Sequence, residues 1–525
     1  MLPTSLAVHA ARLQALRAKS AAHNPPSWLS DCGRWKVSHI VVGQATARSA
    51  AGPPGTHTGS QRLPSEAIVQ TATKQQHAST PREIEQIQLY KRVWHASSAP
   101  ELLHLVGAVD SDDVVSGPTA ARALNRLSLL LRGAPEVERA AARASPALVE
   151  LLAALERGAR QCQPSDASAA LQACVWLSLE LQRCGGAADA LAAQLAEQAP
   201  VADARDVVRS LAALARLGHS GAPLLDAVER LALAGGPAAG QQELGELGWL
   251  EAMRPMLLAL LVWSLAKLGR GSPPLLQAAA AALAARGKVS QLSAGEAVQL
   301  LYSFGLLGHD PGAPLLPQLA ALLRRCLPEL APQGLANAAY GLARLGCGDA
   351  ELVAALAAAA APRAAEFSTA ELAMLLAAFS SLRVRDDLLL SAAAEQLATR
   401  AGSCSARDLS DLLSAMATLD FRPPPYMLAA AAHRAAALAP RAPPASLAWQ
   451  LWAFARLGHR PNALLAALDR QARTDSARLH SFGPEELSKT LWALARMGHY
   501  SGEQVERCAC ATACHSIPPL RLLGR

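Results

Sequence analysis

One segment of the chain reads Leu487-Ser-Lys-Thr-Leu-Trp-Ala-Leu-Ala-Arg-Met-Gly-His499. Its last six residues recur upstream, in three close copies, two weaker copies and two copies that lack the glycine. In that order, the copies are Leu214–His219, Leu342–Cys347, Phe454–His459, Leu265–Arg270, Phe304–His309, Phe379–Arg383 and Met416–Asp420. We call the glycine position the marker and count residues backward from it, so that position −2 stands two residues before the marker.

The marker recurs with a constant period. From Gly269 to Gly498 the steps between markers are 39, 38, 37, 37, 38 and 40 residues. A single globular core does not produce so regular a spacing. A stack of identical units does, because each unit buries its apolar face only against its neighbours.

Each unit has the pattern of two helices. Large apolar residues favour positions −11, −7, −4 and −1, which lie on one face of an α-helix. Ser293, Ser368 and Ser405 have an acid three residues later, the spacing of a capping box at a helix start. The marker glycine is suited to end the first helix, and a proline-containing turn leads to the second. The sequence predicts an all-α, right-handed solenoid of about 38-residue helix–turn–helix repeats, a superhelix like those of TPR and PPR proteins.

A second pattern runs along the first helix of each unit. Position −5 is small throughout, position −2 is basic in five units and position −9 varies. These positions fall within about 60° of one another around the helix. Single-stranded RNA suits such a stripe, because the small residue leaves room for a base, the cation meets a phosphate and the variable residue reads a base edge. The predicted phosphate contacts are Arg216, Lys267, Arg344, Arg456 and Arg496. The predicted base-facing residues are Arg209, Gln299, Asn337, Asp411, Trp449 and Lys489.

Structural explanations compete with this interpretation. Any exposed helix face is polar, and a cation in the last helical turn is favoured by the helix dipole. Position −6 is aromatic in five units, and we expect these rings to pack in the core against the paired helix. A solenoid that binds proteins also accommodates a variable position beside a fixed cation, so a protein-interaction scaffold remains an alternative.

The composition agrees with a helical array. The chain of 525 residues is 51% hydrophobic and only 4% aromatic, and alanine, the best helix former, is abundant. A net charge of +7 permits a polyanionic partner without establishing one. The ten cysteines form no framework of short even spacings, which favours a reducing compartment. No run of 18 apolar residues predicts a membrane span.

The first 80 residues differ from the rest. They contain eight Lys or Arg residues but only two acids, Asp31 and Glu66, among many Ser, Thr, Ala, Gly and Pro residues. This composition is typical of an organellar transit peptide, with a disordered basic tail as the alternative. We therefore expect residues 1–80 to be a disordered transit peptide, residues 84–510 to form nine or ten repeats with an insertion at 234–248, and residues 511–525 to be a short tail.

The repeat resembles a known family. The unit length, the proline-containing turn and the segment from Leu487 to His499 are similar to the octotricopeptide repeat proteins of green-algal organelles, which are related to FAST-kinase-like proteins with a RAP domain. Ile87–Val106 and Ala121–Leu131 resemble the opening segment and first repeat of that family. The resemblance covers roughly residues 84 to 510. It implies sequence-specific binding of organellar RNA in transcript stabilisation, processing or translation activation.

The chain departs from the family pattern in three places. The units near Cys174–Gly185 and Ala378–Asp420 are degenerate, Ala234–Gly248 is an insertion, and only 27 residues follow Gly498. A RAP domain does not fit in 27 residues, which argues against the second alternative, an RNA-processing factor with FAST-kinase-like activity.

The sequence offers no convincing catalytic or cofactor site. Phosphate-binding, dinucleotide-binding, zinc-protease and nucleophile-elbow motifs are absent. Cys508, Cys510, Cys514 and His515 lack the spacing of a structural zinc site. The histidines that follow several markers fit helix ends better than catalysis. We therefore expect a non-enzymatic protein without metal, cofactor or small-molecule substrate. We expect it to bind single-stranded RNA, together with other proteins of a ribonucleoprotein complex, in the chloroplast, with the mitochondrion as the alternative.

Overall fold

The computed structural model describes residues 81–109, 115–234, 248–474 and 481–499. Every regular element within these ranges is a helix, which confirms the predicted all-α solenoid. The α-helices are α3 (Pro81–His95), α4 (Ala99–Gly107), α5 (Gly117–Leu130), α6 (Glu136–Ala144), α7 (Pro146–Gly158), α8 (Pro164–Trp176), α9 (Leu181–Gln198), α10 (Ala204–Leu217), α11 (Ala222–Leu233), α12 (Trp249–Ala252), α13 (Pro255–Leu268), α14 (Pro273–Ala284), α15 (Ala294–Leu307), α16 (Leu315–Cys326), α17 (Pro332–Leu345), α18 (Ala350–Ala360), α19 (Thr369–Leu382), α20 (Asp387–Arg400), α21 (Ala406–Thr418), α22 (Pro425–Leu438), α23 (Pro444–Arg456), α24 (Asn462–Thr474) and α25 (Pro484–Arg496). Short 3₁₀ turns occupy Ala159–Gln161, Ala285–Gln291, Leu327–Glu329, Ala361–Glu366 and Ala401–Ser403.

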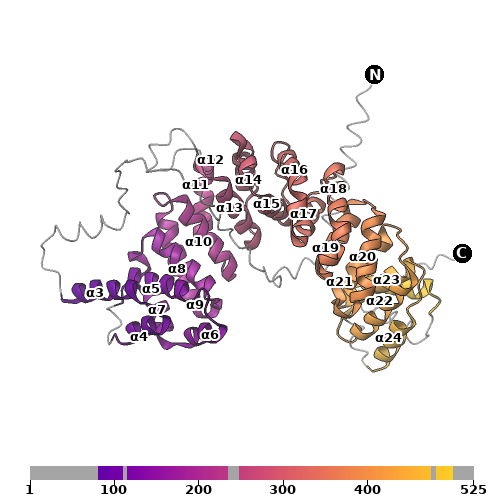
Figure 1. Cartoon of the computed structure of the whole chain (residues 1–525), viewed down its shortest axis with the longest axis horizontal. Coiled ribbons are helices and arrows are strands. Elements are labelled where there is room, and N and C mark those ends of the chain that lie inside the picture. Colours follow the sequence, from indigo (N-terminus) through magenta and orange to yellow (C-terminus); the bar gives the residue numbers. More distant parts are fainter. Residues whose placement is uncertain (1–80, 110–114, 235–247, 475–480, 500–525) are drawn as a thin grey trace, which may run out of the picture.

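The helices stack as two parallel rows. The first helices of the units are α3, α5, α8, α10, α13, α15, α17, α19, α21, α23 and α25, and each packs on the next in this order. The second helices form the other row, which is packed less closely in the middle of the chain. The stack curves into an arch (Figure 1), where α13, α15 and α17 lie on the inner side and α14 and α16 on the outer side. At the middle of the arch, the inner side is therefore built from first helices.

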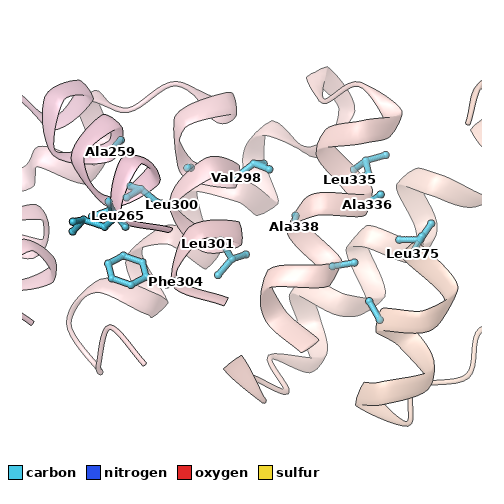
Figure 2. Packing of buried hydrophobic residues seen from close by; sticks show 14 of the residues in the cluster. Ala259, Leu265, Val298, Leu300, Leu301, Phe304, Leu335, Ala336, Ala338 and Leu375 are labelled. Carbon is cyan, nitrogen blue, oxygen red and sulfur yellow. The ribbon is translucent and has the colours of Figure 1, made fainter. Parts of the chain in front are cut away.

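The core runs continuously between the first helices. Positions −11 and −4 are buried in every unit from α10 to α25, and position −7 is buried in all but the last. Position −1 is mostly only half-buried, so the predicted apolar face is confirmed in its first three positions. Leu265, Phe304 and Leu335 illustrate how neighbouring units share this core (Figure 2). Burial at every interface, rather than in one centre, is what a stack of dependent units requires.

Helix starts and stops follow the sequence signals. Ser293, Ser368 and Ser405 all form complete capping boxes with the acid three residues later. The marker glycines end their helices in the left-handed region; Gly346, for example, has φ +63°. Arg383 and Asp420 adopt the same conformation, with φ +59° and +52°, although a side chain makes it unfavourable. The units called degenerate therefore keep the repeat geometry and store strain at the marker.

Histidines after the marker connect neighbouring units. The Nε2 atom of His219 lies 2.8 Å from Oδ1 of Asp189 on α9, in the preceding unit. His499 and Asp469 on α24 repeat this pair at 3.1 Å. The backbone N–H of His219 donates to the carbonyl of Leu214, which completes the helix end. The backbone N–H groups of these histidines, and not their side chains, therefore bond to the carbonyls at the helix end. The side chains of His219 and His499 instead contact the second helix of the preceding unit.

Some predictions lie outside the described residues. These are the transit peptide at 1–80, nearly all of the insertion, the tail with Cys508, Cys510, Cys514 and His515, and the end of the array beyond His499. Within the described ranges, no group of histidine, cysteine and acidic residues is arranged to hold a metal ion. None of the helices described has both the length and the apolar character needed to cross a bilayer.

Candidate functional site

The accessible surface of the first helices is a narrow stripe. Each first helix from α8 to α21 touches the preceding first helix, the following one and its own second helix, so little of its circumference reaches solvent. Positions −9 and −2 are at least partly exposed in every unit from α10 to α25. Position −6 lies about 60° or less from both around the helix. We call positions −9, −6 and −2 of the first helices the first-helix stripe.

The predicted place of position −5 in this stripe is wrong. All eight small residues at this position are buried, so none leaves room for a base. The physical reason is the close approach of first helices. At Gly341 on α17, a Cβ atom would lie 2.7 Å from the backbone carbonyl of Leu301 on α15. Position −5 is small because the preceding first helix occupies the space.

Position −6 takes the place in the stripe that was predicted for position −5. The rings of Trp263, Tyr302 and Trp452 are half-buried, and that of Trp492 is 42% exposed. Of the five aromatic residues at this position, Tyr340 alone is buried, at 8% exposure. The expected packing in the core is confirmed for Tyr340, and the half-buried ring of Trp452 also packs against the core, whereas Trp263, Tyr302 and Trp492 do not belong to it. The aromatic residues face the same side as the cations.

Cations and rings interleave along the stripe. The Arg216 guanidinium lies 5.0 Å from the ring centroid of Trp263 in the following unit. Nζ of Lys489 lies 4.3 Å from the Trp449 ring in the preceding unit. Cation–π contacts of this kind hold the charge against the ring while both stay accessible. Tyr302 and Tyr340 also contact across units, with centroids 5.2 Å apart.

The predicted phosphate contacts lie at one end of the stacked first helices, but they differ in what they touch. Nε of Arg344 donates to the carbonyl of Gly305 at 3.4 Å, and Nε of Arg496 donates to that of Ala455 at 3.3 Å. Both arginines therefore tie their unit to the preceding one. Arg456 pairs with Asp420 at 3.0 Å. Lys267 is exposed and has no ion pair within the described ranges.

The predicted base-facing residues all reach the surface to some degree. Arg209 is exposed, whereas Gln299, Asn337, Asp411, Trp449 and Lys489 are half-buried. Lys489 also pairs with Glu485 on its own helix. The structure brings Trp449 and Lys489 together directly, and it spreads the others along the stripe, each on a different first helix.

One part of the stripe is hollowed into a cavity of about 620 Å³ between α19, α21, α23 and α25. Its lining residues are Ser380, Ser381, Arg383, Thr418, Trp449, Trp452, Arg456 and Lys489. The hollow forms where the ring at position −6 is missing, because α19 has Ala377 there and α21 has Ser414. The cavity therefore joins three predicted site residues, Trp449, Arg456 and Lys489, to tryptophan and arginine side chains that the predictions left out.

Arg383 is the clearest residue that the sequence interpretation missed. It occupies a marker position in the strained left-handed region, lines the cavity and has no ion pair among the described residues. The sequence signal was present as the replacement of a glycine by a cation, but it was interpreted as degeneracy. The N-terminal units contain further missed pairs: Arg122 lies 5.1 Å from the Trp94 ring, and Arg132 lies 4.9 Å from that of Trp176.

Asp411 gives the stripe a titratable group near neutral pH. Burial raises the pKa of its carboxyl to about 7, against the opposing effect of Arg407, whose Nε lies 4.0 Å away; neighbouring Asp408 raises it further. A raised pKa means that the folded protein binds this proton more tightly than the unfolded chain. Its contribution to stability is complete below the ordinary pKa of about 4 and is lost as the pH rises through about 7.

Replacing Asp411 with asparagine is expected to remove this pH dependence. The variant should gain stability relative to the original protein between pH 5 and pH 8, by at least about 1 kcal/mol, the free energy of roughly one pKa unit. Urea denaturation at both pH values measures the difference. The lowered pKa values of His309 and His459, caused by burial, affect both proteins equally. Identical pH slopes for the two proteins would contradict the assignment.

Comparison with known proteins gives one informative match. Residues 242–503 match the family model of the RNA-editing substrate-binding complex 6 protein. This range includes α12 to α25 with a few residues on either side, and it points to an RNA-associated helical family. No curated protein matches the chain. A homology model of the full-length AP-3 complex in an intermediate open conformation is similar over 87% of this chain and 80% of that chain, at 13% identity and a TM-score of 0.23, which is too weak to inform fold or function.

Proposed function

We propose that this protein binds single-stranded RNA along the first-helix stripe and acts in post-transcriptional gene expression in an organelle. The observation that supports this most is the interleaving of half-exposed rings with cations along one side of the solenoid. Bases stack on aromatic rings whatever their identity, and phosphates follow the cations, so the two together suit an extended single strand.

The family match agrees with this proposal. The matched family is named for a complex that binds RNA-editing substrates, and the match includes α13 to α25, where most of the stripe lies. The similarity of the repeat to octotricopeptide repeat proteins favours binding of particular organellar transcripts. Partner proteins of a ribonucleoprotein complex are compatible with the exposed second helices.

The proposed action requires no chemistry by the protein itself. A solenoid that occupies a transcript blocks exonucleases or holds a translation start open, and we propose no enzymatic activity. The chloroplast is the proposed compartment, and the mitochondrion is the alternative. Crosslinking in isolated organelles, followed by sequencing of the attached RNA, tests target and compartment together. Recovery of a protein partner with no crosslinked RNA would favour the scaffold alternative instead.

Base selectivity is expected to depend on position −9. Gln299 and Asn337 are half-buried amides on adjacent first helices, and amides pair with specific donors and acceptors on base edges. Changing either to alanine should alter the preferred RNA sequence at one position, by roughly 1–3 kcal/mol for the affected base. Selection from a randomised RNA pool measures the preference. Equal losses for matched and random RNA would show that these side chains do not discriminate bases.

A further inference from the structure

The cavity between α19 and α25 combines three departures from the repeat. Two consecutive units lack the ring at position −6, which leaves space, and the following unit places Trp449 and Trp452 at its edge. The first of these units also replaces its marker glycine with Arg383. These departures coincide in space, although they are spread over three repeats of the sequence.

The two tryptophans form a defined aromatic corner. Their ring centroids lie 5.3 Å apart and the planes meet at 81°, an edge-to-face contact. Lys489 lies against the Trp449 ring from the next unit. In an edge-to-face corner, a flat group that stacks on one ring meets the other ring at its edge, and Lys489 covers one face of Trp449. A flat group with a large π surface fits it best.

The rest of the lining suits a phosphate. Arg383 and Arg456 supply two guanidinium groups, and Ser380 and Thr418 supply hydroxyls. None of the residues that line the cavity is acidic, although Asp420 pairs with Arg456. Guanidinium groups bind phosphate oxygens through paired N–H donors.

Arg383 is one of four non-glycine residues with positive φ in the described ranges, with Ser178, Arg286 and Asp420, and it is the one of the four that lines the cavity. Its φ of +59° matches the marker glycines, which adopt this conformation at little cost. The space around Gly346 and Gly458 is open, so packing does not demand a side chain at these equivalent positions. Strain of this type is concentrated at ligand sites.

We propose that this cavity binds one purine nucleotide of the RNA, with the base stacked in the tryptophan corner and a phosphate held by Arg383 and Arg456. The inference rests on the proposed RNA binding and makes it more specific. The stripe as a whole contacts the RNA along its length. The cavity binds one base that is turned away from its neighbours, and this fixes the position of the RNA on the solenoid.

Arg383→Gly separates binding from folding. The substitution restores the repeat consensus and removes strain, so the thermal midpoint should rise while binding weakens. We expect oligoadenylate to bind the original protein more tightly than oligouridylate in fluorescence anisotropy at low salt. Arg383→Gly and Trp449→Ala should each weaken oligoadenylate binding, the latter by about 5- to 150-fold, as for the loss of one stacked base. Trp449→Phe, which keeps a ring, should recover most of the loss.

Ser178→Gly is the matched control. Ser178 has φ +53° in the turn after α8, outside the cavity lining, so the glycine should raise the thermal midpoint and leave binding unchanged. The proposal is overturned if Arg383→Gly and Trp449→Ala bind both oligonucleotides as Ser178→Gly does, or if the original protein does not prefer oligoadenylate. In either case RNA binding along the stripe still stands. Failure of the original protein to bind either oligonucleotide would refute the proposed function itself.

Discussion

Replacing Phe304 with alanine is expected to lower the free energy of unfolding by about 3–5 kcal/mol. Phe304 is fully buried at position −4 of α15 (Figure 2). Its ring also contacts that of His309, with centroids 6.1 Å apart. The truncation leaves a cavity within the tightly packed row of first helices. In a solenoid, the loss of this side chain weakens the packing of α15 on both neighbouring units, because each unit is stabilised by its contacts with the adjacent ones.

Urea denaturation followed by circular dichroism measures this effect, and Leu388→Ala is the control. Leu388 is 77% exposed at the start of α20, so its truncation should change stability by no more than about 0.5 kcal/mol. A Phe304→Ala variant as stable as the control would show that α15 is not part of a shared core.

Most of the fold was predictable because each unit repeats the same local signals. Capping serines, marker glycines and apolar residues at positions −11, −7 and −4 act within one or two helical turns, and many copies reinforce the same interpretation. Even Arg383 and Asp420 follow the glycine geometry, because the neighbouring units impose it. Regularity along the chain compensates for weak signals in a single copy.

The makeup of the stripe was only partly predictable. Helical periodicity correctly placed positions −9 and −2 on the accessible side, but positions −5 and −6 flank this side at nearly equal angles. Which of these two positions is buried depends on where the neighbouring first helix packs, and that is a property of the tertiary structure. The approach of α15 to Gly341 decides it, and no residue within one unit records this contact.

The cavity was missed for a related reason. Each of its features appears in the sequence as a small irregularity in a different unit, such as Ala377, Ser414 or Arg383. When the units are compared with a consensus repeat, such irregularities are interpreted as degeneracy of the repeat. The three-dimensional stack aligns them, because a residue at one position contacts the same position in the next unit roughly 38 residues later.

The largest effect on binding is expected from removing cations of the stripe together. Arg216, Lys267 and Arg456 are the suitable set, because Arg344 and Arg496 bond to backbone carbonyls of the preceding unit and their loss would disturb packing. Each phosphate contact to single-stranded RNA contributes roughly 0.7 to the slope of log affinity against log salt. Changing all three residues to alanine should lower the magnitude of this slope by about 2.

The salt dependence distinguishes this prediction from a general loss of folding. With a slope lower by about 2, the affinity ratio between the original protein and the variant should shrink roughly 15- to 20-fold when salt rises fourfold. The control is the triple alanine variant of Arg183, Arg230 and Arg325, which are exposed on the second helices α9, α11 and α16 and carry the same total charge. If only long-range attraction acted, the two triple variants would have equal slopes of log affinity against log salt. If the RNA contacts the stripe, the slope falls only when the first-helix cations are removed, because only these cations release counterions from the bound strand. Equal slopes for the two triple variants would therefore place the RNA elsewhere on the protein.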